Sequence, residues 1–193
     1  IASHLSVMRS SLIGGLIANI RHNANRKQSR VRLFELGRVF MRDASVEDGP
    51  LEVAGVNQPM RLSGAAWGPA VEEQWGVATR QVDFYDVKMD VEALFGARGH
   101  RLRFEAAAHP ALHPGRSARI ELDGRAIGWI GELHPRWAQQ ADLAHAPVVF
   151  ELNVDALSEG ELPQVRELSR QPVVVRDQAS DQAGTHHRQM AGD

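Results

Sequence analysis

The sequence predicts an α+β fold, with a mainly antiparallel sheet flanked by helices. Segments with the period-two alternation of strands outnumber those with helical spacing, and hairpins or short loops connect them. The regular strand–helix–strand succession of a parallel sheet is missing from the pattern. The clearest single signal is a hairpin over residues 117–133, in which Asp123-Gly124 joins two alternating runs.

The composition is that of an ordinary globular domain. The chain has 193 residues, of which 43% are hydrophobic, and a formal net charge of −2, so it can build one good-sized core and has no overall basic surplus. It contains no cysteine, which excludes disulfides and cysteine-ligated metal sites. No apolar run approaches the ~20 residues that cross a bilayer, so we expect a cytoplasmic protein without a membrane span. Because the chain begins at Ile1 and enters a helical pattern at once, we expect part of a longer protein.

An apolar stripe near the N-terminus predicts the first helix. Its members, which we call the apolar stripe, recur at helical spacing: Met8, Leu12, Ile13, Leu16, Ile17 and Ile20. The stripe needs a cover, either the chain's own sheet or another polypeptide. Gly14 and Gly15 lie in its middle, and each costs a helix roughly 1 kcal/mol relative to alanine. Such glycines are tolerated most easily where another backbone comes close.

A strand is predicted to follow this helix. The polar run at residues 26–29 breaks the helical pattern, and from Val31 the apolar period changes to two. Val31 and Leu33 then point to one side, and Phe34 and Leu36 to the other. Since both faces are apolar, we expect this strand inside a sheet rather than at its edge.

The remaining elements follow from the same signals. Residues 42–59 carry turn-forming Asp, Gly, Pro and Asn and are expected to form a loop. Pro69 favours a short helix over residues 69–75, and an Asp83 cap before helically spaced apolar residues predicts a helix over residues 83–95. We also expect strands at residues 60–67, 102–107 and 148–154, a short helix from His134-Pro135 to Ala141, and a turn at residues 155–157.

No short motif predicts a metal site. His109 and His113 are four residues apart, but each precedes a proline, which disfavours helix, so a rigid loop is the expected structure. The helix at residues 83–95 carries a cluster of carboxylates, which we expect to form a solvated face paired in part with Lys88. The cluster consists of Asp83, Asp86, Asp90 and Glu92.

Six segments of the sequence resemble segments of one protein family and occur in the same order. They are LSVMRSSLIGGL at residues 5–16, IRHNANR at 20–26, RLFELGRVF at 32–40, VDFYDVKMDVEAL at 82–94, HPGRSARI at 113–120 and IGWIGELHP at 127–135. On these segments the chain resembles the late core region of the bacterial phenylalanyl-tRNA synthetase beta subunit. From about residue 160, LPQVRELSRQPVVVRD resembles the start of the family's ferredoxin-like anticodon-binding domain.

The resemblance implies two parts. Residues 1–159 would form a class II aminoacyl-tRNA synthetase-like core, and residues 160–193 a truncated start of the anticodon-binding domain. The second part departs from the family pattern at Gln171 and Gln178. Residues 180–193 are polar and aperiodic, so we expect them to be disordered.

The resemblance also implies a core that has lost its catalytic cations. A class II active site needs a motif 2 arginine for the ATP α-phosphate and the substrate carboxylate, and a motif 3 arginine for the γ-phosphate. The motif-2-like strand here carries Glu35 and Arg38 without the Arg-x-Glu arrangement, and the motif-3-like segment has Trp129 and Glu132 but no matching arginine. We therefore expect no catalytic, cofactor-binding or metal-binding residue in this chain. ATP and magnesium are expected for the whole enzyme.

The role implied is to scaffold the catalytic alpha subunit of a phenylalanine-tRNA ligase and to help position tRNA. In the family, the helix that matches residues 8–20 packs with the alpha subunit in a helical bundle, so the six residues of the apolar stripe are predicted to form the subunit interface. His113 and Arg116, in the HPGRSA loop, are candidates for a partner or RNA contact. Two alternatives stay open: a synthetase-like paralogue that binds a small ligand, and a stand-alone RNA-binding module.

Overall fold

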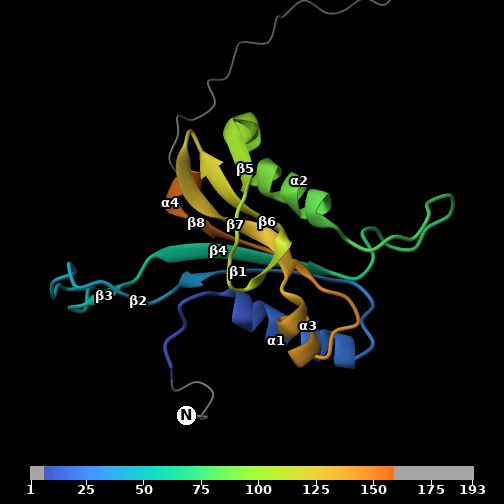
Figure 1. Cartoon of the computed structure of the whole chain (residues 1–193), viewed down its shortest axis with the longest axis horizontal. Helices are drawn as coiled ribbons and strands as arrows, with labels where there is room; N and C mark the ends of the chain where they lie inside the picture. The colour runs from blue at the N-terminus through green and yellow to red at the C-terminus, as the bar shows by residue number, and fades with distance from the viewer. Residues whose placement is uncertain (1–6, 159–193) are drawn as a thin grey trace, which may run out of the picture. The chain divides into compact units, whose positions relative to one another are not determined.

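A six-stranded antiparallel sheet organises residues 7–158, which are the residues that the computed structural model describes (Figure 1). The strands lie in the order β1-β4-β8-β7-β6-β5. Their bounds are β1 Val31–Arg38, β4 Met60–Trp67, β5 Leu102–Ala106, β6 Leu112–Leu122, β7 Arg125–Leu133 and β8 Val148–Asn153. The last strand, β8, inserts between β4 and β7, so the middle of the sheet is completed by the end of the described chain.

Helices cover both faces of this sheet (Figure 1). α1 (Ile13–Asn25) and α3 (Pro135–Gln140) lie on one face, whereas α2 (Phe84–Leu94) and the short α4 (Asp155–Ser158) lie on the other. A 3-10 helix, η2 (Gly96–Arg101), leads from α2 into β5. The predicted fold class, a mainly antiparallel sheet flanked by helices, is confirmed.

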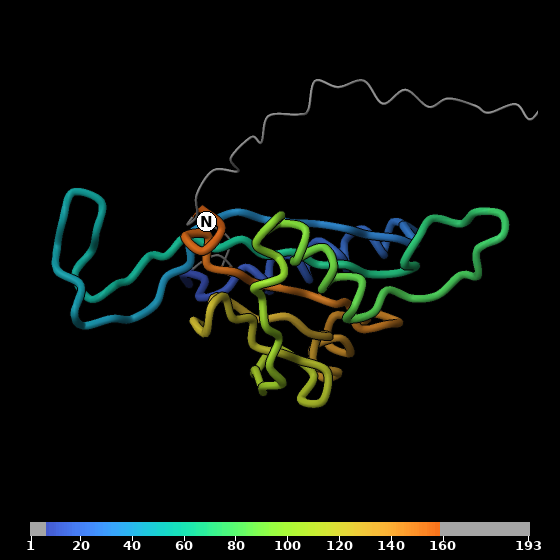
Figure 2. Tube along the Cα trace, turned by 90° about the horizontal axis from the view of Figure 1, so that it is seen from above, coloured from blue at the N-terminus to red at the C-terminus, as the bar shows by residue number. Residues whose placement is uncertain are grey.

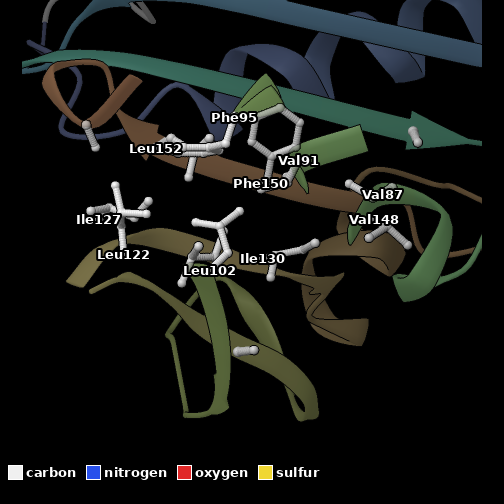
Figure 3. Close-up of a cluster of buried hydrophobic side chains, with 14 of the residues drawn as sticks. Val87, Val91, Phe95, Leu102, Leu122, Ile127, Ile130, Val148, Phe150 and Leu152 are labelled. Carbon is white, nitrogen blue, oxygen red and sulfur yellow. The ribbon is translucent and has the colours of Figure 1, made fainter. Parts of the chain in front are cut away.

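The alternation of side chains along the strands gives each face its own core. In β8, Val148, Phe150 and Leu152 point to the α2 side, whereas Val149 points to the α1 side. Figure 3 shows the α2-side core, to which Val91 of α2 and Phe150 of β8 both belong. Burial of one such aliphatic or aromatic side chain is worth roughly 1.5–3 kcal/mol.

The hairpin of β6 and β7 forms where the sequence predicts it. Asp123 and Gly124 have φ values of 51° and 79°, which is the backbone geometry that a tight Asp-Gly turn requires. The strands predicted at residues 60–67, 102–107 and 148–154 are β4, β5 and β8, and the short helix after His134 is α3.

α2 begins at the predicted aspartate cap. The Asp83 carboxylate accepts the N–H groups of Tyr85 at 2.9 Å and Asp86 at 3.1 Å, and the Asp86 carboxylate accepts the Asp83 N–H at 2.9 Å. This reciprocal capping box satisfies donors that a helix N-terminus leaves unpaired. The Arg80 guanidinium also donates to both Asp86 oxygens at 2.6 Å, and these hydrogen bonds lower the pKa of Asp86 to about 2.

Acidification should therefore weaken the cap of α2. Because the pKa of Asp86 is lower in the folded chain than its ordinary 3.8, the stability from its charged form is complete above about pH 4 and is lost as the pH falls through 2. We expect the difference in unfolding free energy between wild type and Asp86→Asn to shrink from pH 5 to pH 2.5 in urea titrations. A difference that stays constant over this range would contradict the assignment.

The other predicted carboxylates on α2 are also paired with cations. Asp90 lies 3.8 Å from the Arg32 guanidinium, and Glu92 accepts a hydrogen bond from Lys88 at 2.5 Å. The helix face is thus a polar surface with partners inside the chain, including the predicted Lys88 pair. None of the described residues, 7–158, forms a group of three or more His, Cys, Asp or Glu side chains suited to hold a metal ion.

β1 is an edge strand, which corrects the prediction that it lies inside the sheet. Within residues 7–158 it pairs only with β4, and Phe34 and Leu36 on its α2 side are 78% and 59% exposed. The assignment of residues to faces was right, because Val31 and Leu33 enter the α1-side core. The alternation of residues in β1 shows which apolar side chains lie on each face of the strand. It does not show which other segments cover those faces. α2 packs on β7 and β8 and leaves Phe34 and Leu36 uncovered.

Two long connections project from opposite ends of the sheet (Figure 2). The one at residues 39–59 contains the expected loop and also a small pair of strands, β2 (Met41–Arg42) and β3 (Val56–Asn57). The other, at residues 68–82, contains no helix, so the short helix predicted at residues 69–75 is wrong. Pro69 bridges to Gln81 instead, which gives the segment an extended start.

The predictions for residues 160–193, both the anticodon-binding domain start and the disorder of residues 180–193, lie outside the described residues. Within residues 7–158, no helix combines the length and apolar character that crossing a membrane requires.

Candidate functional site

Most of the apolar stripe is buried within the chain itself. Leu12, Ile13, Leu16 and Ile20 are at most 5% exposed, and α1 packs on β1, β4 and β8. The chain's own sheet covers these four side chains and leaves little of their apolar area for a partner to bury, which argues against them as the centre of the predicted subunit interface. A contact between α1 and another subunit stays a prediction, and it depends on residues that keep exposed surface, such as the half-buried Ile17 at the border of this core.

Met8 does not belong to the helix. α1 begins at Ile13, and Met8 lies in the preceding segment with 64% of its side chain exposed. The start is set by Glu151 of β8, whose carboxylate accepts the Leu12 N–H at 2.8 Å and the Ser11 hydroxyl at 3.0 Å. The helical spacing of apolar residues extends N-terminally to Met8. The helix itself begins only where the Glu151 carboxylate of the sheet accepts N–H groups that a helix N-terminus leaves unpaired.

Sequence reasoning missed Glu151, although the sequence carries a signal for it. Glu151 is the one charged residue in the apolar run of β8, VVFELN, and it alternates to the same side as Val149. A carboxylate at an inward position of a central strand needs hydrogen-bond donors. Here the N-terminus of α1 supplies them.

An open apolar groove lies between α1 and α3. It has a volume of about 450 Å³, and Ile17 and Ala18 of α1 face Trp137 and Ala141 across it. Trp137 is held in place by a hydrogen bond from its indole N–H to the Pro110 carbonyl at 3.3 Å. Within residues 7–158, this groove gives α1 an open apolar surface beside it.

Of the two glycines of α1, Gly14 lines this groove, whereas Gly15 lies outside it. A side chain at Gly14 would meet no atom of residues 7–158 within 4 Å, and one at Gly15 would meet only the Glu35 carboxylate at 3.5 Å. Therefore the close backbone that was expected beside these glycines is not found within the described chain. Each glycine destabilises the helix by roughly 1 kcal/mol relative to alanine, and no packing contact within the described chain explains this cost.

The motif-2-like residues of β1 contact other parts of the chain. Glu35 forms an ion pair with Arg9, and Arg9 also donates to the Arg38 carbonyl at 3.0 Å. The Arg38 guanidinium donates to the Gln58 carbonyl at 2.9 Å. These contacts fasten residues 7–10 and the connection at residues 39–59 to the end of β1.

The motif-3-like residues have contacts of the same kind. Trp129 packs in the α1-side core against the ring of His109, with 5.0 Å between ring centres, and Glu132 accepts two hydrogen bonds from Arg116 at 2.9 and 2.8 Å. Burial lowers the pKa of His109, so its neutral form is favoured.

His113 and Arg116 lie in β6, where the HPGRSA segment bulges between its pairings with β7. The His113 Nδ1 accepts the Gly115 N–H at 3.0 Å, as His109 accepts the Ala111 N–H at 3.3 Å. Both histidines therefore fix local turns. The expected loop is found at His109, whereas His113 lies within β6. Arg116 is exposed despite its ion pair with Glu132, and its predicted contact with a partner or RNA stays a prediction.

Solved structures share this arrangement of sheet and helices. A crystal structure of pyrrolysyl-tRNA synthetase from Desulfitobacterium hafniense superposes with a TM-score of 0.55 and 12% identity, over 78% of this chain and 48% of that chain. A second structure of that synthetase, PylSc, gives a TM-score of 0.51 and 11% identity over 78% of this chain and 47% of its own. At such identities the likeness shows the fold alone. The fold is that of a tRNA-synthetase-like domain.

Sequence comparisons define the family. Residues 1–154 match the family model described as the phenylalanyl tRNA synthetase beta chain CLM domain, and the chain belongs to this family. The phenylalanine–tRNA ligase beta subunit of Bordetella parapertussis is 78% identical over 179 residues, and that of Ralstonia nicotianae is 63% identical over 177 residues. These matches cover 93% and 92% of this chain but 22% of each relative, so the chain spans about a fifth of the length of the curated relatives it matches.

Proposed function

We propose that this chain is the core part of a phenylalanine-tRNA ligase beta subunit. In this role it scaffolds the catalytic alpha subunit and helps to position tRNA for ATP-dependent aminoacylation with phenylalanine, in the cytoplasm. The observation that carries the proposal is the family match over residues 1–154 together with 78% identity to a beta subunit. The alpha subunit would hold ATP and magnesium.

We further propose that the chain is a catalytically silent class II core. Adenylate formation requires fixed cations at the developing phosphate charge. The positions that resemble motifs 2 and 3 hold Glu35, Arg38, Trp129 and Glu132 instead, and their side chains contact the chain's own groups. This supports a scaffold rather than a second active site.

The alpha subunit is proposed to dock in the groove between α1 and α3. The groove offers an apolar surface next to Gly14, where a helix can approach closely because no side chain intervenes. Two residues of the apolar stripe, Ile13 and Ile17, line this groove, and Ile17 is the more exposed of the two. Leu12, Leu16 and Ile20 are buried inside the chain.

Co-expression with a catalytic alpha subunit tests this proposal. Ala18→Glu puts a carboxylate into the groove, and we expect it to weaken the complex at least tenfold, because removing a charge from water in an apolar interface is costly even beside Arg21. The matched control is Asn19→Glu, which adds the same charge one residue further along α1, outside the groove, and should leave the complex intact. Affinity can be measured by biolayer interferometry on purified subunits.

Two results would overturn the proposal. Wild-type chain that forms no complex with the alpha subunit would remove the scaffold role, and equal binding by both variants would move the interface away from the groove. Phenylalanine-dependent pyrophosphate exchange by the purified chain alone, with contaminating synthetase excluded, would contradict the silent core.

A further inference from the structure

The positive charge of this chain is unevenly distributed. Residues 1–34 contain six Arg and Lys and no Asp or Glu, whereas the whole chain has a formal net charge of −2. The N-terminal sixth is therefore strongly basic within an acidic protein, and half of these cations lie on α1 and the turn that follows it. Charge asymmetry of this kind is a property of the surface rather than of the fold.

Three of the six cations have acidic partners. Arg9 pairs with Glu35, Arg30 lies 4.0 Å from Glu72, and Arg32 lies 3.8 Å from Asp90. The other three are exposed and make no hydrogen bond or ion pair through their side chains within residues 7–158: Arg21, Arg26 and Lys27. With the exposed His22, these residues make up what we call the cationic end of α1.

The helix dipole accounts for only part of this charge. Cations near a helix C-terminus are favoured by a partial negative charge of roughly half a unit. Three full positive charges exceed it severalfold, and the last carbonyl groups of α1 already accept the N–H groups of Arg26, Lys27 and Gln28. The positive charge at the cationic end of α1 is therefore not balanced by the helix dipole, so an anionic ligand would be attracted to it.

The neighbouring side chains distinguish between kinds of anionic partner. Beyond the groove that Arg21 lines, the exposed residues around the cationic end are polar: Asn19, Asn25, Gln28 and Ser29. A protein interface needs apolar or aromatic anchors at its centre and is depleted in lysine there. Phosphate groups are bound by Arg and Lys together with Asn, Gln and Ser side chains, which is the set present here.

We propose that the cationic end of α1 binds the phosphate backbone of RNA, without reading its bases. Arg21 and the helix C-cap Arg26 are separated by about 8 Å at 1.5 Å per residue, which suits about two phosphates. This inference rests on the proposed function, which makes tRNA a ligand of the whole assembly, and it assigns a place to the contact. That place adjoins the groove at Arg21 but extends beyond it to Arg26 and Lys27.

The test uses tRNA binding by the full chain at several salt concentrations. In Arg26→Gln/Lys27→Gln, both changes lie outside the groove and glutamine keeps good helix propensity. We expect its tRNA affinity to fall roughly tenfold or more at 0.1 M salt and the slope of log affinity against log salt to decrease by about 1.5. The control, Arg42→Gln/Arg103→Gln, removes two exposed cations from β2 and β5 that also make no side-chain hydrogen bond or ion pair within residues 7–158, so the net charge is matched.

Each outcome decides the proposal. Loss of affinity in the α1 variant alone supports it, whereas equal losses in both variants, or no tRNA binding by wild type, overturn it. The same variants are then combined with the alpha subunit. A complex that fails only for Arg26→Gln/Lys27→Gln, with tRNA affinity unchanged, makes the cationic end a protein contact and overturns the RNA site while the proposed function stands. Absence of a wild-type complex instead counts against the proposed function and leaves the RNA result independent.

Discussion

Gly128→Ala is expected to destabilise the fold by more than about 3 kcal/mol, which is a large part of the 5–15 kcal/mol typical of a domain. Gly128 lies in β7, and a Cβ there would stand 2.2 Å from the Glu151 carbonyl oxygen and 3.0 Å from the Leu152 Cα in the neighbouring strand. These are backbone atoms of a central strand, so neither can move without disturbing the sheet. Thermal unfolding followed by circular dichroism measures the effect.

The matched control is Gly14→Ala. Nothing within residues 7–158 lies within 4 Å of a Cβ at that position, and the residue is helical, so alanine should raise the unfolding free energy by up to about 1 kcal/mol. Opposite signs for the two glycines are the expected result. A Gly128→Ala protein as stable as wild type would mean that β7 and β8 do not pair as described.

Leu16→Asp is expected to unfold the chain rather than to report on a partner. Leu16 is 2% exposed in the α1-side core, and a carboxylate there would have neither water nor a cation beside it. The cost is the lost apolar burial plus the desolvation of a charge, in total more than about 4 kcal/mol. Urea unfolding at neutral pH, without any other subunit present, measures it.

Asn19→Asp is the control for this substitution, because Asn19 is exposed on the same helix. It should change the unfolding free energy by no more than about 0.5 kcal/mol. If Leu16→Asp were as stable as Asn19→Asp and lost only its binding to the alpha subunit, the original interface assignment for Leu16 would be restored.

Elements fixed by local chemistry were predictable from the sequence. The Asp123-Gly124 turn needs positive φ at both residues, and the Asp83 cap of α2 is satisfied by N–H groups two and three residues on. In both cases the deciding atoms lie within a few positions of one another. The sequence therefore contains the complete local explanation.

Features decided by distant segments were not predictable. The start of α1 depends on Glu151, 139 positions from Leu12, and the edge position of β1 depends on the order in which six strands pair. The apolar stripe was recognised, but its period does not tell whether the cover comes from the same chain. The structure shows that four of its six members are covered internally, so the outer side of α1 carries the remaining candidate contacts.

The link between Glu151 and Leu12 also sets an order for biosynthesis. A ribosome releases α1 long before it has polymerised Glu151, and β4 is likewise made well before β8, its partner on the inner side. Until then the nascent chain holds a helix segment without its carboxylate cap and an incomplete sheet. Formation of the native domain is therefore confined to the end of translation of this region, a delay that chains built from sequentially paired strands avoid.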